Sequence, residues 1–477
     1  MHEGTHSPTG PVGSQGGPSS TGGRRALTVG LMLTVTLVAL ESLAIATVMP
    51  EVRADLGGYS LYGWVFSGFF LSSLVGIVVG GVAADRGSLV IPFGGGLIFF
   101  SAGLVVAGLA PNMGVLVVGR LLQGLGAGAV PAASYAAIAR AFTSEERPRM
   151  FAMLSTAWVV PGLVGPAAAA AIEHALSWRW VFLGLLPVVG VAGTISAGPL
   201  SRVRPPRGEG EREADHSSTS RLAKVGLLVV GVGAVFGATS SGSAPVMGAV
   251  GLGGMVLGVW AFMGLVPPGT ARAAPGIPAT IAVRGLLTWS FFQADAYVSL
   301  LVIEGRGRST FLAGAALSAG SVLWAVGSWV QARQIGVWGP RTLVGSGLAV
   351  MVVALTLATS VALGAPVVLM VVAWGVGGVG VGLAYSPLSV VVLAAARPGE
   401  EGAASASLQL CDVLGVAVGT GVGGAVVAAG ADRGWQVSSS VALAFGFAVV
   451  VGIVAMGASR RIPAQVPATT LAAGQAA

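Results

Sequence analysis

Long apolar segments, rather than alternating apolar and polar positions, dominate the pattern of residues along the chain. A helix rises about 1.5 Å per residue, so a segment of about 18 or more apolar residues is long enough to cross a hydrocarbon core of about 30 Å. The pattern therefore predicts an all-α membrane protein with about 14 transmembrane helices. We place these helices near residues 26–49, 62–84, 89–110, 114–139, 150–172, 178–199, 223–239, 246–266, 280–303, 310–331, 341–361, 365–394, 403–429 and 435–458.

The order of these segments predicts two six-helix bundles joined by a linker. Gly81-x-x-x-Asp85-Arg86 ends the second segment, and Gly327-x-x-x-Gln331-x-Arg333 ends its counterpart in the second half, which indicates an internal duplication. Two similar bundles that face each other can rock about a central site and give alternating access. The predicted units are a disordered cytoplasmic tail at 1–24, a bundle at 25–200, a cytoplasmic loop plus a linker helix pair at 201–278, a second bundle at 279–460 and a disordered tail at 461–477.

The linker is the least constrained part of this prediction. A charged, proline-containing loop is expected at 201–222, followed by the short apolar segments 223–239 and 246–266. If these two segments do not cross the membrane, the number of spans is twelve rather than fourteen. The orientation of the chain is the same in both cases, because the pair adds an even number of crossings.

The composition supports insertion into a membrane, and the distribution of basic residues predicts which side of the membrane the two termini face. The chain is 54% hydrophobic and only 9% charged, with 76 glycines and a mean hydropathy of +0.85. Most of its 25 basic residues, Arg284 among them, fall at segment ends on the same side as both termini. Because basic residues are enriched on the cytoplasmic side, we expect both termini to be cytoplasmic in a multi-pass plasma-membrane protein. Scattered in this way, the basic residues do not form a nucleic-acid-binding patch.

Several classes of chemistry are excluded by residue type. The single cysteine, Cys411, leaves no internal disulfide and no cysteine-based zinc site, and all four histidines lie outside the apolar segments, so no metal site is expected. The single lysine, Lys224, follows Ala223, so the Gly-Lys pair of a phosphate-binding loop is absent. We therefore expect neither an enzyme nor an ATP-driven pump, and no cofactor other than a proton gradient.

A few ionisable residues lie inside the apolar segments, where an isolated charge is costly and tends to face a cavity, a partner or a proton path. Glu41 and Asp295 lie at similar depth in the first helix of each predicted bundle, and Asp412 lies nearer the middle of its segment. Arg120 comes to a depth similar to that of Glu41, so the two side chains are expected to be able to pair.

Two interpretations of these acids stay open. In the first, at least one of Glu41, Asp295 and Asp412 exchanges protons as the protein alternates, and Asp295 is the preferred candidate because it has no evident basic partner. Burial favours the neutral carboxyl and a nearby cation favours the ionised one, so proton and cargo would compete for the same group. In the second, Glu41 and Arg120 form a permanent structural pair, and the other acids are hydrogen-bonded to neighbouring helices.

Aromatic side chains in the segments are candidates to line an apolar cavity for an amphipathic cargo. Ordinary helix packing or a position at the membrane interface is the alternative for each of them. The candidates are Trp64, Trp158, Trp289, Phe292, Tyr297 and Tyr385.

Five motifs give the chain a resemblance to the major facilitator superfamily, specifically to the fourteen-span drug:proton antiporters. The resemblance covers most of residues 25–460. It implies a two-bundle transporter fold, gating roles for Asp85, Arg86, Gly162, Gly165 and Pro166, and an embedded arginine at Arg120. The motifs are Leu40-Glu41-Ser42 through Pro50, Gly81 through Arg86, Arg120-Leu121-Leu122-Gln123-Gly124, Pro161-Gly162-Leu163-Val164-Gly165-Pro166 and Ser177-Trp178-Arg179-Trp180.

The function expected from the embedded acids and the resemblance is proton-driven export of a hydrophobic or cationic small molecule. A proton symporter that takes up a nutrient is the first alternative, because the same acids would serve it. A membrane sensor that transports nothing is the second. The partners expected are a small-molecule substrate, protons and the lipid bilayer.

Overall fold

The computed structural model describes residues 21–142, 146, 150, 153, 159–203, 211–240, 246–395 and 401–465. Within this part the chain is helical and contains no strand, which confirms the predicted fold class. The helices are α1 (Thr21–Leu56), α2 (Tyr59–Arg86), α3 (Val90–Gly108), α4 (Met113–Ala141), α6 (Val159–Ala175), α7 (Arg179–Leu183), α8 (Leu186–Ser201), α9 (Glu211–Ser240), η1 (Met247–Gly251), α11 (Leu252–Met263), η2 (Thr270–Arg272), α12 (Ile277–Leu300), η3 (Leu301–Gly305), α13 (Thr310–Ala362), α14 (Leu369–Ala395), α15 (Glu401–Asp432) and α16 (Val437–Ser459).

Eleven helices in the described residues are long and apolar enough to cross a membrane. One of them, the 53-residue α13, contains two of the expected spans, which meet at Gly339. Gly339 has a φ of 71° and precedes Pro340. Glycine adopts this left-handed conformation without strain, so the chain turns there from one span into the next. With the shorter helices α6 and α11, this arrangement agrees with about 14 spans.

The charged segment at 201–222 differs from the expected loop. Its second half is helical, because α9 begins at Glu211 and continues into the apolar span. No proline or glycine occurs between Glu211 and Arg221, and acidic residues such as Glu211 and Glu213 favour a helix N-terminus through the helix dipole. Likewise Thr21–Arg24, expected in the tail, form the start of α1. The tail predictions for 1–20 and 466–477 lie outside the described residues.

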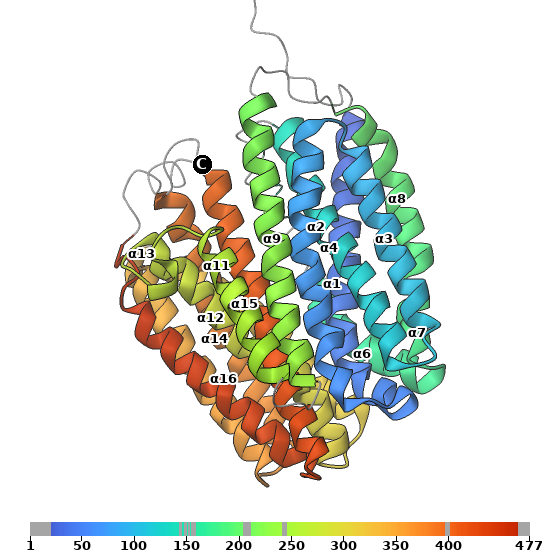
Figure 1. Cartoon of the computed structure of the whole chain (residues 1–477), viewed down its shortest axis with the longest axis vertical. Coiled ribbons are helices and arrows are strands. Elements are labelled where there is room, and N and C mark those ends of the chain that lie inside the picture. Colours follow the sequence, from blue (N-terminus) through green and yellow to red (C-terminus); the bar gives the residue numbers. More distant parts are fainter. Residues whose placement is uncertain are drawn as a thin grey trace, which may run out of the picture.

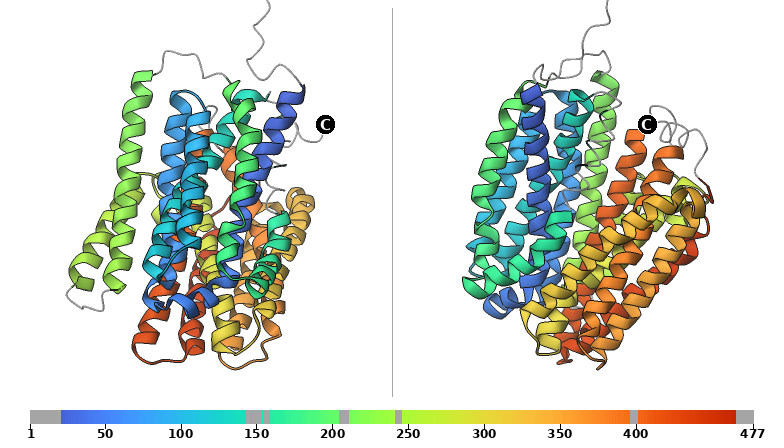
Figure 2. Two further views of the ribbon diagram at one scale, coloured as in Figure 1. Left: turned by 90° about the vertical axis from the view of Figure 1, so that its right-hand side faces the viewer. Right: turned by 180° about the vertical axis from the view of Figure 1, so that it is seen from behind.

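The helices form two bundles and an outer hairpin (Figures 1 and 2). The first bundle contains α1 to α8 and the second contains α12 to α16. The hairpin of α9 and α11 lies against both bundles, because α9 packs on α2 and on α15. We call the end of the molecule where α1 begins and α16 ends the terminal end, and the end where α1 stops at Leu56 the distal end.

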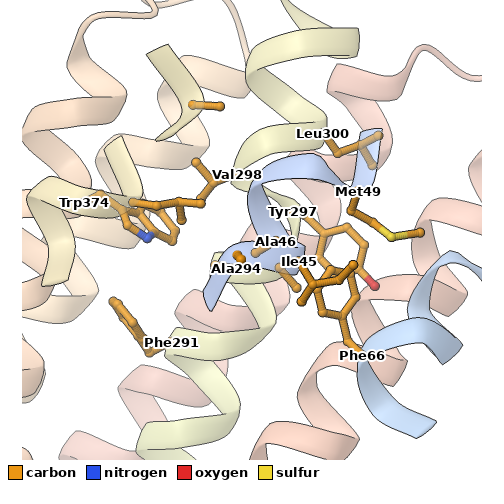
Figure 3. Packing of buried hydrophobic residues seen from close by; sticks show 14 of the residues in the cluster. Ile45, Ala46, Met49, Phe66, Phe291, Ala294, Tyr297, Val298, Leu300 and Trp374 are labelled. Carbon is orange, nitrogen blue, oxygen red and sulfur yellow. The ribbon is translucent and has the colours of Figure 1, made fainter. Parts of the chain in front are cut away.

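Toward the distal end the two bundles lie in direct contact. A Cβ built on Gly63 of α2 would lie only 2.6 Å from the Cα of Gly424 of α15, so the two helices touch through their backbones. Beside this contact, the rings of Tyr62 and Tyr297 are 5.5 Å apart. Figure 3 shows Met49 of α1 in the same region as Tyr297. This seam holds the bundles together because no side chain separates α2 from α15 there.

Replacing Gly424 by valine is expected to open this seam, because the new side chain overlaps the backbone of α2. Ser67 of α2 is 1% exposed in the present conformation. In a Ser67→Cys, Cys411→Ser background, Gly424→Val should raise labelling of the new cysteine by a membrane-impermeant maleimide. Each kcal/mol of shift in the conformational equilibrium corresponds to about a fivefold change in population.

The matched control is Gly457→Val, because a Cβ on Gly457 meets nothing within 4 Å. Equal labelling rates in the two valine variants would contradict the importance of the α2–α15 contact.

Candidate functional site

Glu41 and Arg120 form an ion pair inside the first bundle, between α1 and α4. Each side chain is only 1% exposed. Arg120 donates from Nη1 to Glu41 Oε1, and its Nε donates to the carbonyl of Val65 at 3.0 Å. The ring of Phe69 lies 4.2 Å from the guanidinium carbon. The pairing expected from depth along the helices is therefore confirmed, and both charges are compensated within a closed environment.

Gln123 is a member of this site that the sequence analysis did not single out. Its Oε1 accepts from Arg120 Nη1 at 2.9 Å. Arg120 and Gln123 are three residues apart and therefore lie on one face of α4. This spacing is the feature of the sequence from which their contact could have been predicted. The second carboxylate oxygen of Glu41 and the Gln123 amide nitrogen are both buried without a partner among the described protein atoms.

Asp295 lies in the corresponding helix of the second bundle, α12, but in a different environment. Its side chain is partly exposed, and Trp374 Nε1 of α14 donates to its Oδ1 at 2.8 Å. In both bundles, therefore, the first helix carries an acid and the fourth helix donates a hydrogen bond to it. The donor is a charged guanidinium in the first bundle and a neutral indole in the second. Within the described residues, Asp295 has no ion-pair partner.

Asp412 pairs with Arg284, and this arginine corrects the sequence-based assignment. Arg284 was placed at the cytoplasmic end of its span, but it lies about two turns inside α12 and is only 5% exposed. Its Nε donates to Asp412 Oδ1 at 2.9 Å, and the hydroxyl of Tyr385 donates to Asp412 Oδ2 at 2.7 Å. The carboxylate accounts for the deep position, because a paired charge is far less costly to bury than an isolated one.

Three of the aromatic candidates make packing or hydrogen-bond contacts with neighbouring protein groups in this conformation. Tyr297 is fully buried and donates to the carbonyl of Thr420 at 2.7 Å. Trp64 meets Phe236 of α9 edge-on at 6.1 Å. Trp289 donates to Gln293 Oε1 at 2.8 Å. Trp158 lies outside the described residues.

The other aromatic candidates belong to a row of rings that joins the surroundings of Asp295 to those of Asp412. The ring centroids are 5.8 Å apart for Trp374 and Phe291, 5.9 Å for Phe291 and Trp324 and 5.3 Å for Trp324 and Tyr385. Phe292 lies beside this row, 6.2 Å from Trp324. Figure 3 shows the part formed by Trp374 and Phe291. In this conformation Trp374 and Phe291 are only 2% and 5% exposed, and the guanidinium of Arg284 lies over the ring of Tyr385.

The two motifs for which the resemblance implies gating roles fall at contacts between helices. Asp85 and Arg86 end α2, and their side chains lie outside the described part of the chain. Arg140 of α4 caps this helix end, donating to the carbonyl of Ala84 and to that of Gly87 at 3.0 Å.

The helix 5 motif, Gly162, Gly165 and Pro166, lies in α6. A Cβ on Gly162 would lie 2.9 Å from the Cβ of Ser321 in α13. A Cβ on Gly314 of α13 would lie 3.2 Å from the carbonyl oxygen of Pro166. The motif therefore forms a close contact between the two bundles.

A polar cluster at the distal end was missed by sequence reasoning. Arg53 Nε of α1 lies 2.6 Å from Glu304 Oε1 of η3, and the hydroxyl of Tyr59 of α2 donates to Glu304 Oε2 at 2.5 Å. These residues tie the two bundles together. They lie at the ends of their spans, where charges are common and carry little information. Their contact could have been predicted from one feature of the sequence. Arg53 and Glu304 lie near the ends of the first helices of the two bundles, and their charges are opposite.

Removing the charge of Glu304 is expected to loosen this tie. Glu304→Gln should raise maleimide labelling of Ser67→Cys, because a neutral amide leaves Arg53 without its counter-ion. Exchanging the charges, Arg53→Glu with Glu304→Arg, should return the rate toward that of the parent protein.

The control for this prediction is Asp55→Asn. Asp55 lies at the same end of α1, but its partner, Arg179 at 2.6 Å, belongs to the same bundle. If Asp55→Asn raised labelling as much as Glu304→Gln, the inter-bundle tie would have no special role.

Comparison with known proteins places this architecture in a family. Residues 31–335 match the model of the Major Facilitator Superfamily. The chain belongs to the major facilitator superfamily. As a member of this superfamily, it is a multi-pass membrane transporter and not an enzyme.

Relatives of this superfamily member carry efflux names. "Probable multidrug-efflux transporter Rv1634" of Mycobacterium tuberculosis is 28% identical over 453 residues, which are 88% of this chain and 91% of the relative. "Multidrug resistance protein 3" of Bacillus subtilis is 31% identical over 160 residues, which are 34% of this chain and 31% of the relative. The match with this second relative spans only about a third of its length.

Solved structures show the same fold at low sequence identity. A bacterial homologue of the human lysosomal transporter Spinster, in an inward-facing conformation, has a TM-score of 0.67 and 16% identity, and the match covers 93% of this chain and 98% of that one. An autoinhibited peptide transporter of the POT family has a TM-score of 0.65 and 15% identity, with coverage of 93% and 98%.

Proposed function

We propose that this transporter is a proton antiporter that exports hydrophobic or cationic small molecules, with Asp295 as the group that exchanges the proton for cargo. The observation that carries the proposal is the difference between the embedded acids. Glu41 and Asp412 are each held by an arginine, whereas Asp295 is partly exposed and is held by a neutral indole. A carboxyl without a fixed counter-ion can be neutralised either by a proton or by a bound cation.

Antiport follows when proton and cargo exclude each other at one group. With Asp295 protonated, the site offers a cation no charge. With Asp295 ionised, the site attracts a cation, and the buried rings of Trp374 and Phe291, which pack on each other, give it apolar surroundings. Because an ionised carboxyl inside the membrane-spanning region is costly, we expect the bundles to rearrange only when Asp295 is neutralised, so each crossing carries either a proton or cargo.

Export rather than uptake is supported by the names of the relatives, which include multidrug efflux and multidrug resistance. We propose that the protein lies in the plasma membrane with its terminal end facing the cytoplasm, because the basic residues concentrate at that end. In that orientation the closed α2–α15 seam and the Arg53–Glu304 tie lie on the outer side. The described conformation would then be ready to receive cargo from inside.

The experiment that tests the proposal is transport in proteoliposomes with an imposed proton gradient. The compounds to screen are lipophilic cations, neutral antibiotics and nutrients, with an internal pH dye to follow protons. Cargo moving opposite to protons, and stopping when the gradient is collapsed by an ionophore, is the expected result. Cargo moving in the same direction as protons would establish symport. Cargo movement that is the same with and without the proton gradient would contradict proton coupling.

A further inference from the structure

One face of α13 points away from the second bundle along the first of its two spans. Val322, Val326 and Trp329 lie on this face, and their side chains are 39%, 45% and 58% exposed. Their spacing of three or four residues aligns them along one side of the helix. In a membrane-spanning helix, such an exposed apolar stripe lies against the acyl chains of the lipids.

Arg333 is the first charged residue of α13, and it ends this stripe. It follows Trp329 by one helical turn, and its guanidinium carbon lies over the indole, 3.3 Å from the ring centre. Both side chains are exposed. An exposed tryptophan and an arginine near the end of a span mark the level of the lipid headgroups, because the indole prefers the membrane interface and the guanidinium extends toward it.

The helices around Arg333 offer it no counter-ion within the described residues. α13 contains no acidic residue, and neither does α14 or α16, which both pack against it. The acid of α6, Glu173, lies at the distal end of that helix. The acid of α12, Asp295, is bonded to Trp374. Arg333 therefore has an aromatic ring as its partner but no negative charge.

Further positive charge gathers where α13 turns into its second span. Arg341 follows the kink, and its Nε donates to the carbonyl of Ile462 at 2.7 Å. This bond holds the segment after α16 against the kink, so Arg460 and Arg461 lie at the same end of the bundle. All of these arginines are exposed. Clustered basic residues create a positive potential that attracts anions to this edge of the molecule.

We infer that this face of α13 binds an anionic phospholipid, with the lipid phosphate on Arg333 and an acyl chain along Val322, Val326 and Trp329. The phosphate supplies the negative charge that the surrounding helices do not. A guanidinium can donate two parallel hydrogen bonds to a phosphate and still stack on an aromatic ring, which suits the arrangement of Arg333 on Trp329.

The apolar stripe identifies the occupant as a lipid rather than a soluble phosphate compound. A soluble anion would use the cation alone, whereas a phospholipid uses both the cation and the exposed side chains of the same helix face. The site does not depend on which cargo the protein transports or on how transport is driven, so it stands apart from the proposed antiport.

Native mass spectrometry of the full chain in detergent tests this site. The protein is mixed with equal amounts of phosphatidylglycerol and phosphatidylcholine that carry the same acyl chains, and the bound lipids are counted. The wild-type protein should retain phosphatidylglycerol in preference to phosphatidylcholine. Arg333→Ala should lower this preference about fivefold, which is the effect of one basic residue at an anionic lipid surface.

The matched control is Arg202→Ala. Arg202 is also exposed and follows α8 at the terminal end of the first bundle, so its removal changes the charge of that end by the same amount. This variant should keep the wild-type preference.

Three results would overturn the inference. Equal losses in Arg333→Ala and Arg202→Ala would show that the lipid responds to the total charge of the terminal end and not to a site. Equal retention of the two lipids by the wild-type protein would show that no anionic lipid is selected. Displacement of phosphatidylglycerol by an equal concentration of glycerol 3-phosphate would show that a soluble phosphate, rather than a lipid, occupies Arg333.

Discussion

Asp295→Asn is expected to abolish proton-driven transport. An asparagine has the shape of the protonated carboxyl but can neither release a proton nor attract a cation. The variant therefore stays in a state that resembles the protonated transporter and cannot bind cationic cargo. Loss of a carboxylate–cation contact worth about 2.7 kcal/mol lowers the rate about a hundredfold. The measurement is ethidium movement in proteoliposomes under an imposed proton gradient, compared with that of the wild-type protein.

The control for this variant is Asp432→Asn, which removes a carboxylate that is exposed at the distal end of α15. It should transport as the wild type does. Asp295→Glu, which keeps the charge on a longer side chain, should retain a measurable response to the gradient. Wild-type transport by Asp295→Asn would contradict the assignment and leave Asp295 a structural acceptor for Trp374.

Arg120→Ala is expected to cause the largest loss of stability of any single change considered for this protein. It leaves the Glu41 carboxylate, 1% exposed, without its counter-ion. Breaking a buried pair by removing one partner costs about 3–5 kcal/mol, which corresponds to a fall in Tm of about 3–5 °C for a chain of this size. Thermal unfolding in detergent, followed by tryptophan emission, measures this shift.

Two further variants separate charge from packing. Arg179→Ala breaks the Arg179–Asp55 pair, whose side chains are 36% and 47% exposed, so it should lower Tm by less than about 2 °C. Glu41→Gln combined with Arg120→Gln removes both buried charges and should be more stable than Arg120→Ala alone.

The difference in Tm between Arg120→Ala and the wild-type protein should become smaller at low pH, because protonation of Glu41 removes the unpaired charge. A Tm loss equal in Arg120→Ala and Arg179→Ala would show that the buried pair stabilises no more than an exposed one.

The positions of the spans were predictable because membrane insertion requires a long apolar segment, and such a segment is visible in one dimension. The Glu41–Arg120 pair was predictable for a related reason. Distance along a helix gives depth in the membrane, and two opposite charges at one depth are strongly driven to meet.

What the sequence could not give is the direction in which each side chain points around its helix. That direction is set by packing between helices far apart in the chain. Trp374 was therefore not recognised as the partner of Asp295, and Arg284 was assigned to a helix end although Asp412 holds it inside. The helical start of α9 was missed because the charges of Glu211 to Arg221 resemble those of a loop, although the same charges are compatible with a helix that extends out of the membrane.

The most direct test of the account is whether cargo displaces a proton from Asp295. The purified protein, in detergent and weak buffer, is mixed with ethidium, and the release of protons is followed with a pH-sensitive dye. The account predicts about one proton released per ethidium bound by the wild-type protein, and none by Asp295→Asn. Ethidium binding without proton release, or release that persists in Asp295→Asn, would contradict it.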